Sequence, residues 1–274
     1  MKQIFPLAVL ALFCATDVSF SNEFRVCAWK VAPGDTGTDK TVSDYPILFG
    51  LDEVPFASYF AWFDAGPRSS GRLNHCGGAL IDGAWLLTAR HCLDGKTWTK
   101  LGVSVPQMEH VTEGDLAICP PQAGGFPADD VALLRLKDPV EMPFDVPELK
   151  QVEAFPKGAI LGSWPIRRGV PNLSLQMSPI NVLSLTQKPM FVGQMVDTSE
   201  RVPCGGESGS MMMSTDGSEI FGVLTAISAS AGGRPDCNNP ETEIYVTPLA
   251  GWSDWIDEVV KTCRDTPDAC SKPE

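Results

Sequence analysis

Residues 75–92 read HCGGALIDGAWLLTARHC, and this stretch indicates the fold of the chain around it. Two short apolar runs, 78–81 and 85–89, lie between two cysteines and resemble the arms of a β-hairpin. A disulfide Cys76–Cys92 would hold the segment that carries His91. We therefore expect a strand-rich protein in which this histidine occupies a fixed position.

Other short apolar or alternating runs follow the same pattern along the chain, with Gly, Pro, Asn and Asp between them. They lie at 58–63, 131–136, 160–164, 190–195, 220–227 and 243–247. Many short strands with frequent turns predict an all-β sandwich or barrel. Apolar residues recur at helical spacing only near the end, from Trp252 to Val260.

The composition excludes some classes of protein. Hydrophobic residues make up 43% of the 274 residues, which is enough for a large core. The 34 acidic residues outnumber the 21 basic ones, and the formal net charge is −13. With no basic run, nucleic acid is a poor candidate partner.

The first 21 residues have the pattern of a signal peptide. Lys2 precedes an apolar run at 4–13 that is too short to span a bilayer, and Ser19 and Ser21 precede a cleavage point after residue 21. Residues 22–46 are polar and are interpreted as an N-terminal extension or propeptide outside the core. We expect a secreted protein, either extracellular or periplasmic, that does not bind membranes.

Cysteine content agrees with export. Without Cys14 of the signal segment, the mature chain has an even number of cysteines, at positions 27, 76, 92, 119, 204, 237, 263 and 270. An even count in an exported chain predicts disulfides. No Cys-x-x-Cys pair is present, so we expect no metal site. Cys263 and Cys270 are close enough in sequence to close a small loop in the C-terminal tail.

Three residues have neighbours that suit catalysis. His91 precedes Cys92, Asp130 precedes the apolar run VALLRL, and Ser208 lies in CGGESGS at 204–210. A serine hydroxyl is a weak nucleophile unless a base such as a His–Asp pair activates it. The alternative interpretations are that His91 is a surface histidine, that Asp130 is a solvated acid at the start of a strand, and that Ser208 lies in a polar turn without a catalytic role.

These motifs resemble those of the chymotrypsin/trypsin family of serine proteases, in the family's order of histidine, aspartate and serine segments. A fourth, weaker match is Trp255-Ile256 in a closing helix. The resemblance covers about residues 47–262, which would form the protease domain, with 263–274 as a disulfide-bearing tail. It implies two antiparallel six-stranded β-barrels with a C-terminal helix and an active site between them.

The resemblance also implies a role for each site residue. Ser208 would attack a peptide carbonyl, His91 would serve as general base and then acid, and Asp130 would hold the tautomer of His91. The amides of Gly206 and Ser208 would form the oxyanion hole. The hydroxyl of Thr225 would hydrogen-bond to Asp130.

A specificity pocket and further disulfides follow from the same resemblance. Val202 falls at the pocket base, Ile227 at its entrance and Glu243 on its wall. Ile227 should narrow the pocket and favour small or medium apolar side chains, while Glu243 would attract a basic group or pair with a neighbouring arginine. Cys204–Cys237 matches a family bridge. Cys27–Cys119 is then the remaining pair, although crossed pairings with the tail cysteines stay open.

Two positions depart from the family pattern. The family has an aspartate before the nucleophile, which pairs with a new N-terminal ammonium after cleavage behind a basic residue. Here the acid is Glu207, and the candidate terminus Ile47 follows Pro46. Either another protease cuts before Ile47, or Glu207 pairs with an internal group and no cut is needed, or the oxyanion hole is defective.

We therefore expect a secreted serine endopeptidase that works through an acyl-enzyme intermediate without a cofactor. It would be a monomer that acts on a peptide or protein substrate and is bound by a proteinaceous inhibitor. The alternative is a catalytically silent homologue that acts as a binding or regulatory protein.

Overall fold

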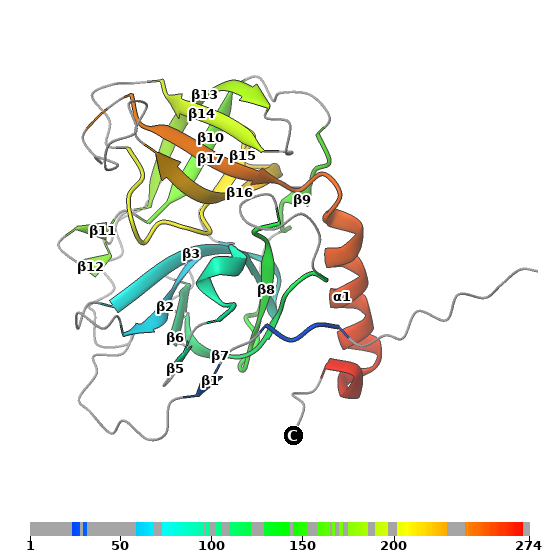
Figure 1. Cartoon of the computed structure of the whole chain (residues 1–274). Helices are drawn as coiled ribbons and strands as arrows, with labels where there is room; N and C mark the ends of the chain where they lie inside the picture. The colour runs from blue at the N-terminus through cyan, green and yellow to red at the C-terminus, as the bar shows by residue number, and fades with distance from the viewer. Residues whose placement is uncertain are drawn as a thin grey trace, which may run out of the picture.

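A computed structural model of the chain describes most of the residues from 59 to 270 and two short pieces before them (Figure 1). The described residues are 24–27, 30–31, 59–67, 73–95, 97–98, 102–105, 110–121, 129–142, 145–152, 158–164, 166–167, 170–171, 175–185, 190–196, 202–228, 239 and 241–270. The predicted signal segment, Ile47 and Cys237 lie outside these ranges.

Six antiparallel strands from the first half of the chain close into a barrel. In barrel order they are β2 (Phe60–Pro67), β3 (Leu73–Asp82), β4 (Trp85–Thr88), β8 (Ala132–Leu136), β7 (His110–Ile118) and β6 (Gly102–Val105). The hairpin predicted at 75–92 is the β3–β4 pair. Its apolar side chains belong to the first of two core clusters.

Six strands from the second half form a second ring, because β15 pairs with both β10 and β16. In order they are β15 (Met211–Met213), β10 (Ala159–Ser163), β13 (Gln176–Leu185), β14 (Phe191–Met195), β17 (Glu243–Pro248) and β16 (Glu219–Ser228). The short strand β9 (Glu148–Leu149) joins β16 in parallel. Two small pairs complete the sheets: β1 (Lys30–Val31) with β5 (Thr97–Trp98), and β11 (Ile166–Arg167) with β12 (Val170–Pro171).

The predicted fold class is confirmed, since each of the eight apolar runs overlaps a strand and a helix follows the second ring. Where the two sets of strands meet, the ring of Phe60 packs against Gly162 of β10 so closely that a Cβ on this glycine would overlap it. The Tyr59 hydroxyl also donates a 3.1 Å hydrogen bond to the carbonyl of Gly217. Burial, together with the nearby Asp216, raises the pKa of the Tyr59 phenol, so the hydroxyl stays a donor.

Helix α1 (Ser253–Asp265) follows β17 and packs on the first core cluster through Ile256, Val259 and Cys263. A 3₁₀ turn (Pro267–Cys270) comes next, and the predicted Cys263–Cys270 bridge ties it to the helix. The boundary expected between residues 262 and 263 therefore falls inside α1. No helix in the described part of the chain has the length and apolar character needed to cross a membrane.

Residues 24–27 of the predicted extension pack against the first barrel. Val26 forms an antiparallel bridge with Ile118, and the Cys27 amide donates to the carbonyl of Ala117 at 2.9 Å. Cys27 is 1% exposed and is bonded to Cys119, as predicted. The interpretation of 22–46 as lying outside the core is thus wrong for this segment, because Cys27 belongs to the first core cluster and Phe24 and Val26 pack against that cluster.

Replacing both Cys27 and Cys119 by alanine should lower the free energy of unfolding substantially. The bridge joins residues 92 apart in sequence, and chain-entropy arguments assign about 4–5 kcal/mol to a loop of that length. The Cys263–Cys270 bridge spans only 7 residues, so removing it is the control and should cost about 2 kcal/mol. Guanidinium titration measures both losses, and a larger loss in the control would contradict this account.

Candidate active site

His91 lies in a single 3₁₀ turn (Arg90–Cys92) directly after β4. Backbone hydrogen bonds close this turn, with the Cys92 amide donating to Ala89 and the Leu93 amide to Arg90 at 3.1 and 2.9 Å. The predicted Cys76–Cys92 disulfide joins it to β3. The imidazole is therefore carried by a rigid connection at the edge of the first barrel.

Asp130 and His91 form a close pair. One carboxylate oxygen of Asp130 lies 2.6 Å from Nδ1 of His91, and the other accepts the His91 backbone amide at 2.7 Å. The Asp130 side chain is only 2% exposed, which rules out the solvated acid considered from the sequence. Because an ionised carboxylate only accepts hydrogen bonds, a neutral imidazole in this position carries its proton on Nδ1 and leaves Nε2 unprotonated.

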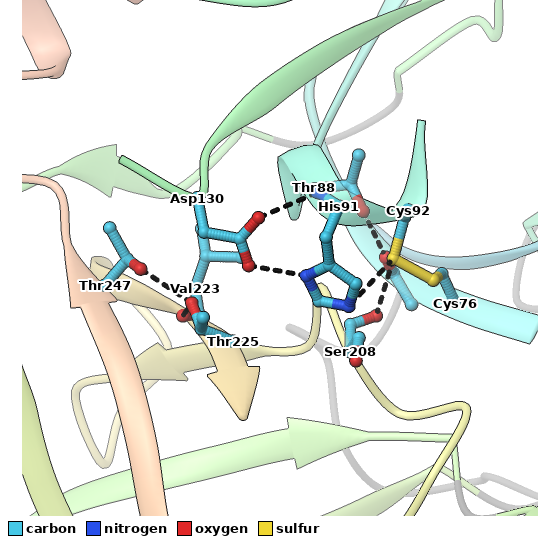
Figure 2. Close-up of polar contacts among 10 residues, drawn as sticks. Cys76, Thr88, His91, Cys92, Asp130, Ser208, Val223, Thr225 and Thr247 are labelled. Atoms are coloured by element: carbon cyan, nitrogen blue, oxygen red, sulfur yellow. Dashed lines mark hydrogen bonds and ion pairs between the residues drawn. A yellow bond between two sulfur atoms is a disulfide. The ribbon is translucent and has the colours of Figure 1, made fainter. Parts of the chain in front are cut away.

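Ser208 lies at the opposite edge of the imidazole, so that His91 stands between Asp130 and Ser208 (Figure 2). The sulfur of Cys92 lies 3.9 Å from both Nε2 of His91 and the carbonyl oxygen of Ser208. This sulfur is in a disulfide and has no proton to donate, so these are packing contacts.

A hydrogen bond between the barrels fixes the backbone of Ser208. The Gly77 amide of β3 donates to the Ser208 carbonyl at 2.7 Å, and the Gly209 amide donates to Leu224 of β16 at 2.8 Å. Gly209 has a φ of +87°, and a Cβ there would overlap the Gly77 carbonyl oxygen and Oγ1 of Thr88. Only glycine allows the serine turn to approach the first barrel so closely.

The four residues before Ser208 form a tight turn. The Glu207 amide donates to the Cys204 carbonyl at 3.1 Å, and Gly206 has a φ of +105°. Within the described residues, the amides of Gly206 and Ser208 donate no hydrogen bond. The family resemblance assigns the oxyanion-hole role to these two N–H groups.

The carboxylate of Glu207 points into the protein and is 2% exposed. It accepts a hydrogen bond from the Ser163 hydroxyl at 2.9 Å and one from the Cys204 amide at 3.1 Å. Sequence reasoning left open what Glu207 pairs with and did not single out Ser163. The only sequence signal was a polar residue near the end of the apolar run 160–164.

Thr225 differs from its expected role. Its hydroxyl lies 2.6 Å from that of Thr247 and donates to the Val223 carbonyl at 3.2 Å. No hydrogen bond from Thr225 to Asp130 is found among the described residues. The expectation is corrected here because Thr247, on the neighbouring strand β17, supplies a hydroxyl partner that competes for Thr225 (Figure 2).

The three expected pocket residues lie in different surroundings. Val202 is completely buried in the second core cluster, so its side chain lines no open pocket in this structure. Ile227 is half-buried on β16. The Glu243 carboxylate accepts a 2.6 Å hydrogen bond from the Tyr245 hydroxyl, and this bond raises the pKa of the Tyr245 phenol.

Cys204 is disulfide-bonded, and its expected partner Cys237 lies outside the described residues. In the described part of the chain, no group of three or more His, Cys, Asp or Glu residues could hold a metal ion.

Gly209→Ala should destabilise the protein and displace the serine turn. The substitution combines a positive φ with overlap of two atoms of the first barrel, and we expect a loss of about 2–4 kcal/mol. Gly205→Ala, in the same turn, is the matched control because an added Cβ there meets nothing within 4 Å. It should change the free energy of unfolding by less than about 0.5 kcal/mol. Equal losses in chemical denaturation would contradict the proposed close approach.

The chain is similar to known proteases in sequence. Over 240 residues it is 28% identical to human kallikrein-12, covering 78% of this chain and 95% of the relative. Over 203 residues it is 25% identical to serine protease 1 of Drosophila melanogaster, covering 66% of this chain and 74% of the relative. Human granzyme M is 26% identical to it over 201 residues, covering 65% of this chain and 77% of the relative.

Solved structures share the fold. Neuropsin, a serine protease expressed in the limbic system of mouse brain, superposes with a TM-score of 0.56 at 18% identity, covering 76% of this chain and 97% of that one. The structure titled HL collagenase superposes with a TM-score of 0.54 at 19% identity. The match covers 74% of this chain and 94% of that one. The family model described as Trypsin matches residues 62–256, which is more than half of the 274 residues, and the chain therefore belongs to the trypsin family of serine proteases.

Proposed function

We propose that the chain hydrolyses peptide bonds through a catalytic triad of His91, Asp130 and Ser208. The observation that carries this proposal is the Asp130 carboxylate, which is buried and bonded to both Nδ1 and the backbone amide of His91. Such a double contact fixes the ring with Nε2 directed away from Asp130, toward the side where Ser208 lies (Figure 2).

In the first step, Oγ of Ser208 would attack the carbonyl carbon of the substrate while its proton passes to Nε2 of His91. Asp130 stabilises the imidazolium that forms, and the amides of Gly206 and Ser208 bind the negative carbonyl oxygen. The imidazolium then gives its proton to the leaving amine, the peptide C–N bond breaks and an acyl-enzyme on Ser208 results. Water, activated by the same histidine, hydrolyses this ester and restores the serine.

The proposal includes secretion of the protein. Three disulfides are found among the described residues, at Cys27–Cys119, Cys76–Cys92 and Cys263–Cys270. Disulfides form and persist mainly in oxidising compartments, which agrees with the signal segment expected from the sequence. Peptides or proteins outside the cell, or in a periplasm, are therefore the proposed substrates.

Ser208→Ala should abolish labelling by a fluorophosphonate probe and reduce peptide hydrolysis by roughly 10⁶-fold, as loss of a triad nucleophile does. The matched control is Ser210→Ala, two residues further along. The Ser210 hydroxyl is buried and has no hydrogen-bond partner in the described structure, so its removal leaves no group unpaired. This control should keep labelling and hydrolysis close to the parent values.

Labelling rates and intact mass, with peptide mapping of the labelled site, measure these effects. The thermal midpoint of Ser208→Ala should stay near that of the parent protein. An unlabelled parent protein would refute the proposed activity and favour the silent binding homologue. Labelling that persists in Ser208→Ala would place the nucleophile elsewhere.

A further inference from the structure

The residue before the proposed nucleophile buries a carboxylate. Glu207 is 2% exposed, although it lies between the solvent-facing glycine turn and Ser208. Removing a carboxylate from water costs several kcal/mol unless hydrogen bonds replace its hydration. The donors that reach Glu207 therefore determine whether the turn before Ser208 forms.

Two described donors reach this carboxylate, and they differ in what they connect. The Cys204 amide bonds to Oε1 at 3.1 Å, which closes the turn on itself. The Ser163 hydroxyl bonds to Oε2 at 2.9 Å and comes from β10, 44 residues earlier in the chain. Of these two bonds, only the one from Ser163 ties the turn to the sheet of the second barrel.

Ser163 is well suited to hold a partner in place. It is the last residue of β10, whose five residues are all buried, and it is 4% exposed. Its backbone pairs with Gln176 of β13, so the hydroxyl starts from a fixed strand. A short side chain on a rigid strand loses little conformational freedom when it forms this bond.

The position of Glu207 determines where the adjacent amides point. Glu207 and Cys204 exchange two hydrogen bonds, one through the backbone and one through the carboxylate. Gly206 lies inside this closed turn and Ser208 follows it directly, and both contribute the N–H groups assigned to the oxyanion. Misplacement of such donors by about 1 Å is enough to reduce catalysis by up to roughly 10²-fold.

We propose that Ser163 is a positioning residue that anchors Glu207 and so forms the oxyanion turn in the uncut chain. In this chain the Pro46–Ile47 peptide bond is intact, so Ile47 has no ammonium group to offer, and the Glu207 turn is nevertheless formed. The anchor in this proposal is the Ser163 hydroxyl, which donates to Oε2 of Glu207 at 2.9 Å. The expected effect on catalysis rests on the proposed function. The hydrogen bond from Ser163 to Glu207 does not depend on that function.

The test compares three variants of the uncut protein with the parent. Ser163→Ala removes the hydroxyl, and Ser163→Thr keeps it. Ser178→Ala is the matched control, because Ser178 is a buried serine (3% exposed) that pairs with Leu161 of the same strand β10 and has no described bond to Glu207. N-terminal sequencing of each sample verifies that no chain starts at Ile47.

The first readout is the rate of fluorophosphonate labelling, together with kcat and KM on a peptide substrate. Ser163→Ala should lower the labelling rate and kcat by about 10- to 100-fold with little change in KM, because the donors act mainly in the transition state. Ser163→Thr should restore most of the rate, and Ser178→Ala should resemble the parent. A Ser163→Ala variant that labels as fast as the parent would overturn the inference and leave the proposed function intact.

The second readout does not depend on activity. Hydrogen exchange at the amides of Cys204 and Glu207 should be slow in the parent, in Ser163→Thr and in Ser178→Ala, and faster in Ser163→Ala. Unchanged exchange in Ser163→Ala would overturn the anchor whatever the labelling shows. If the parent never labels but exchange behaves as expected, the proposed function fails while the anchor stands.

Discussion

One backbone hydrogen bond brings the two halves of the site together: the Gly77 amide of the first barrel donates to the Ser208 carbonyl of the second at 2.7 Å. His91 belongs to one barrel and Ser208 to the other, so the proposed triad depends on this contact. Gly209 makes the contact sterically possible, and the Cys76–Cys92 bridge keeps the histidine turn beside it. The strands, the glycines and the disulfide thus all help to hold two segments of the chain, distant in sequence, in close contact.

Two buried carboxylates flank this contact and have different partners. Asp130 faces a histidine that can become charged, and it accepts both the ring and the backbone amide of that residue. The described donors to Glu207 include the Ser163 hydroxyl and the Cys204 amide. The first arrangement orients the imidazole of His91, and the second closes the turn before Ser208. Each burial is costly alone, so each carboxylate imposes a definite geometry on its surroundings.

Sequence patterns predicted much of the fold because apolar runs bounded by turn residues mark strands. They did not predict strands β7 and β13. Both strands mix polar residues, such as Glu113 and Asn181, with apolar ones, and their pairing depends on the neighbouring strands. Motifs singled out His91, Asp130 and Ser208 as candidates, but a sequence motif does not give side-chain rotamers. The Thr225–Thr247 bond and the Ser163–Glu207 bond join residues 22 and 44 positions apart, and no local pattern encodes such pairs.

The central claim is that an uncut chain presents Ser208 and two amide donors in working geometry. A crystal structure of the uncut protein after reaction with a phosphonate tests this most directly, because the phosphoryl oxygen occupies the place of the oxyanion. The account predicts a covalent bond to Oγ of Ser208, with that oxygen about 2.7–3.1 Å from the amides of Gly206 and Ser208. It also predicts that Glu207 stays buried against Ser163. An adduct whose phosphoryl oxygen meets neither amide, with Glu207 turned into solvent, would contradict it.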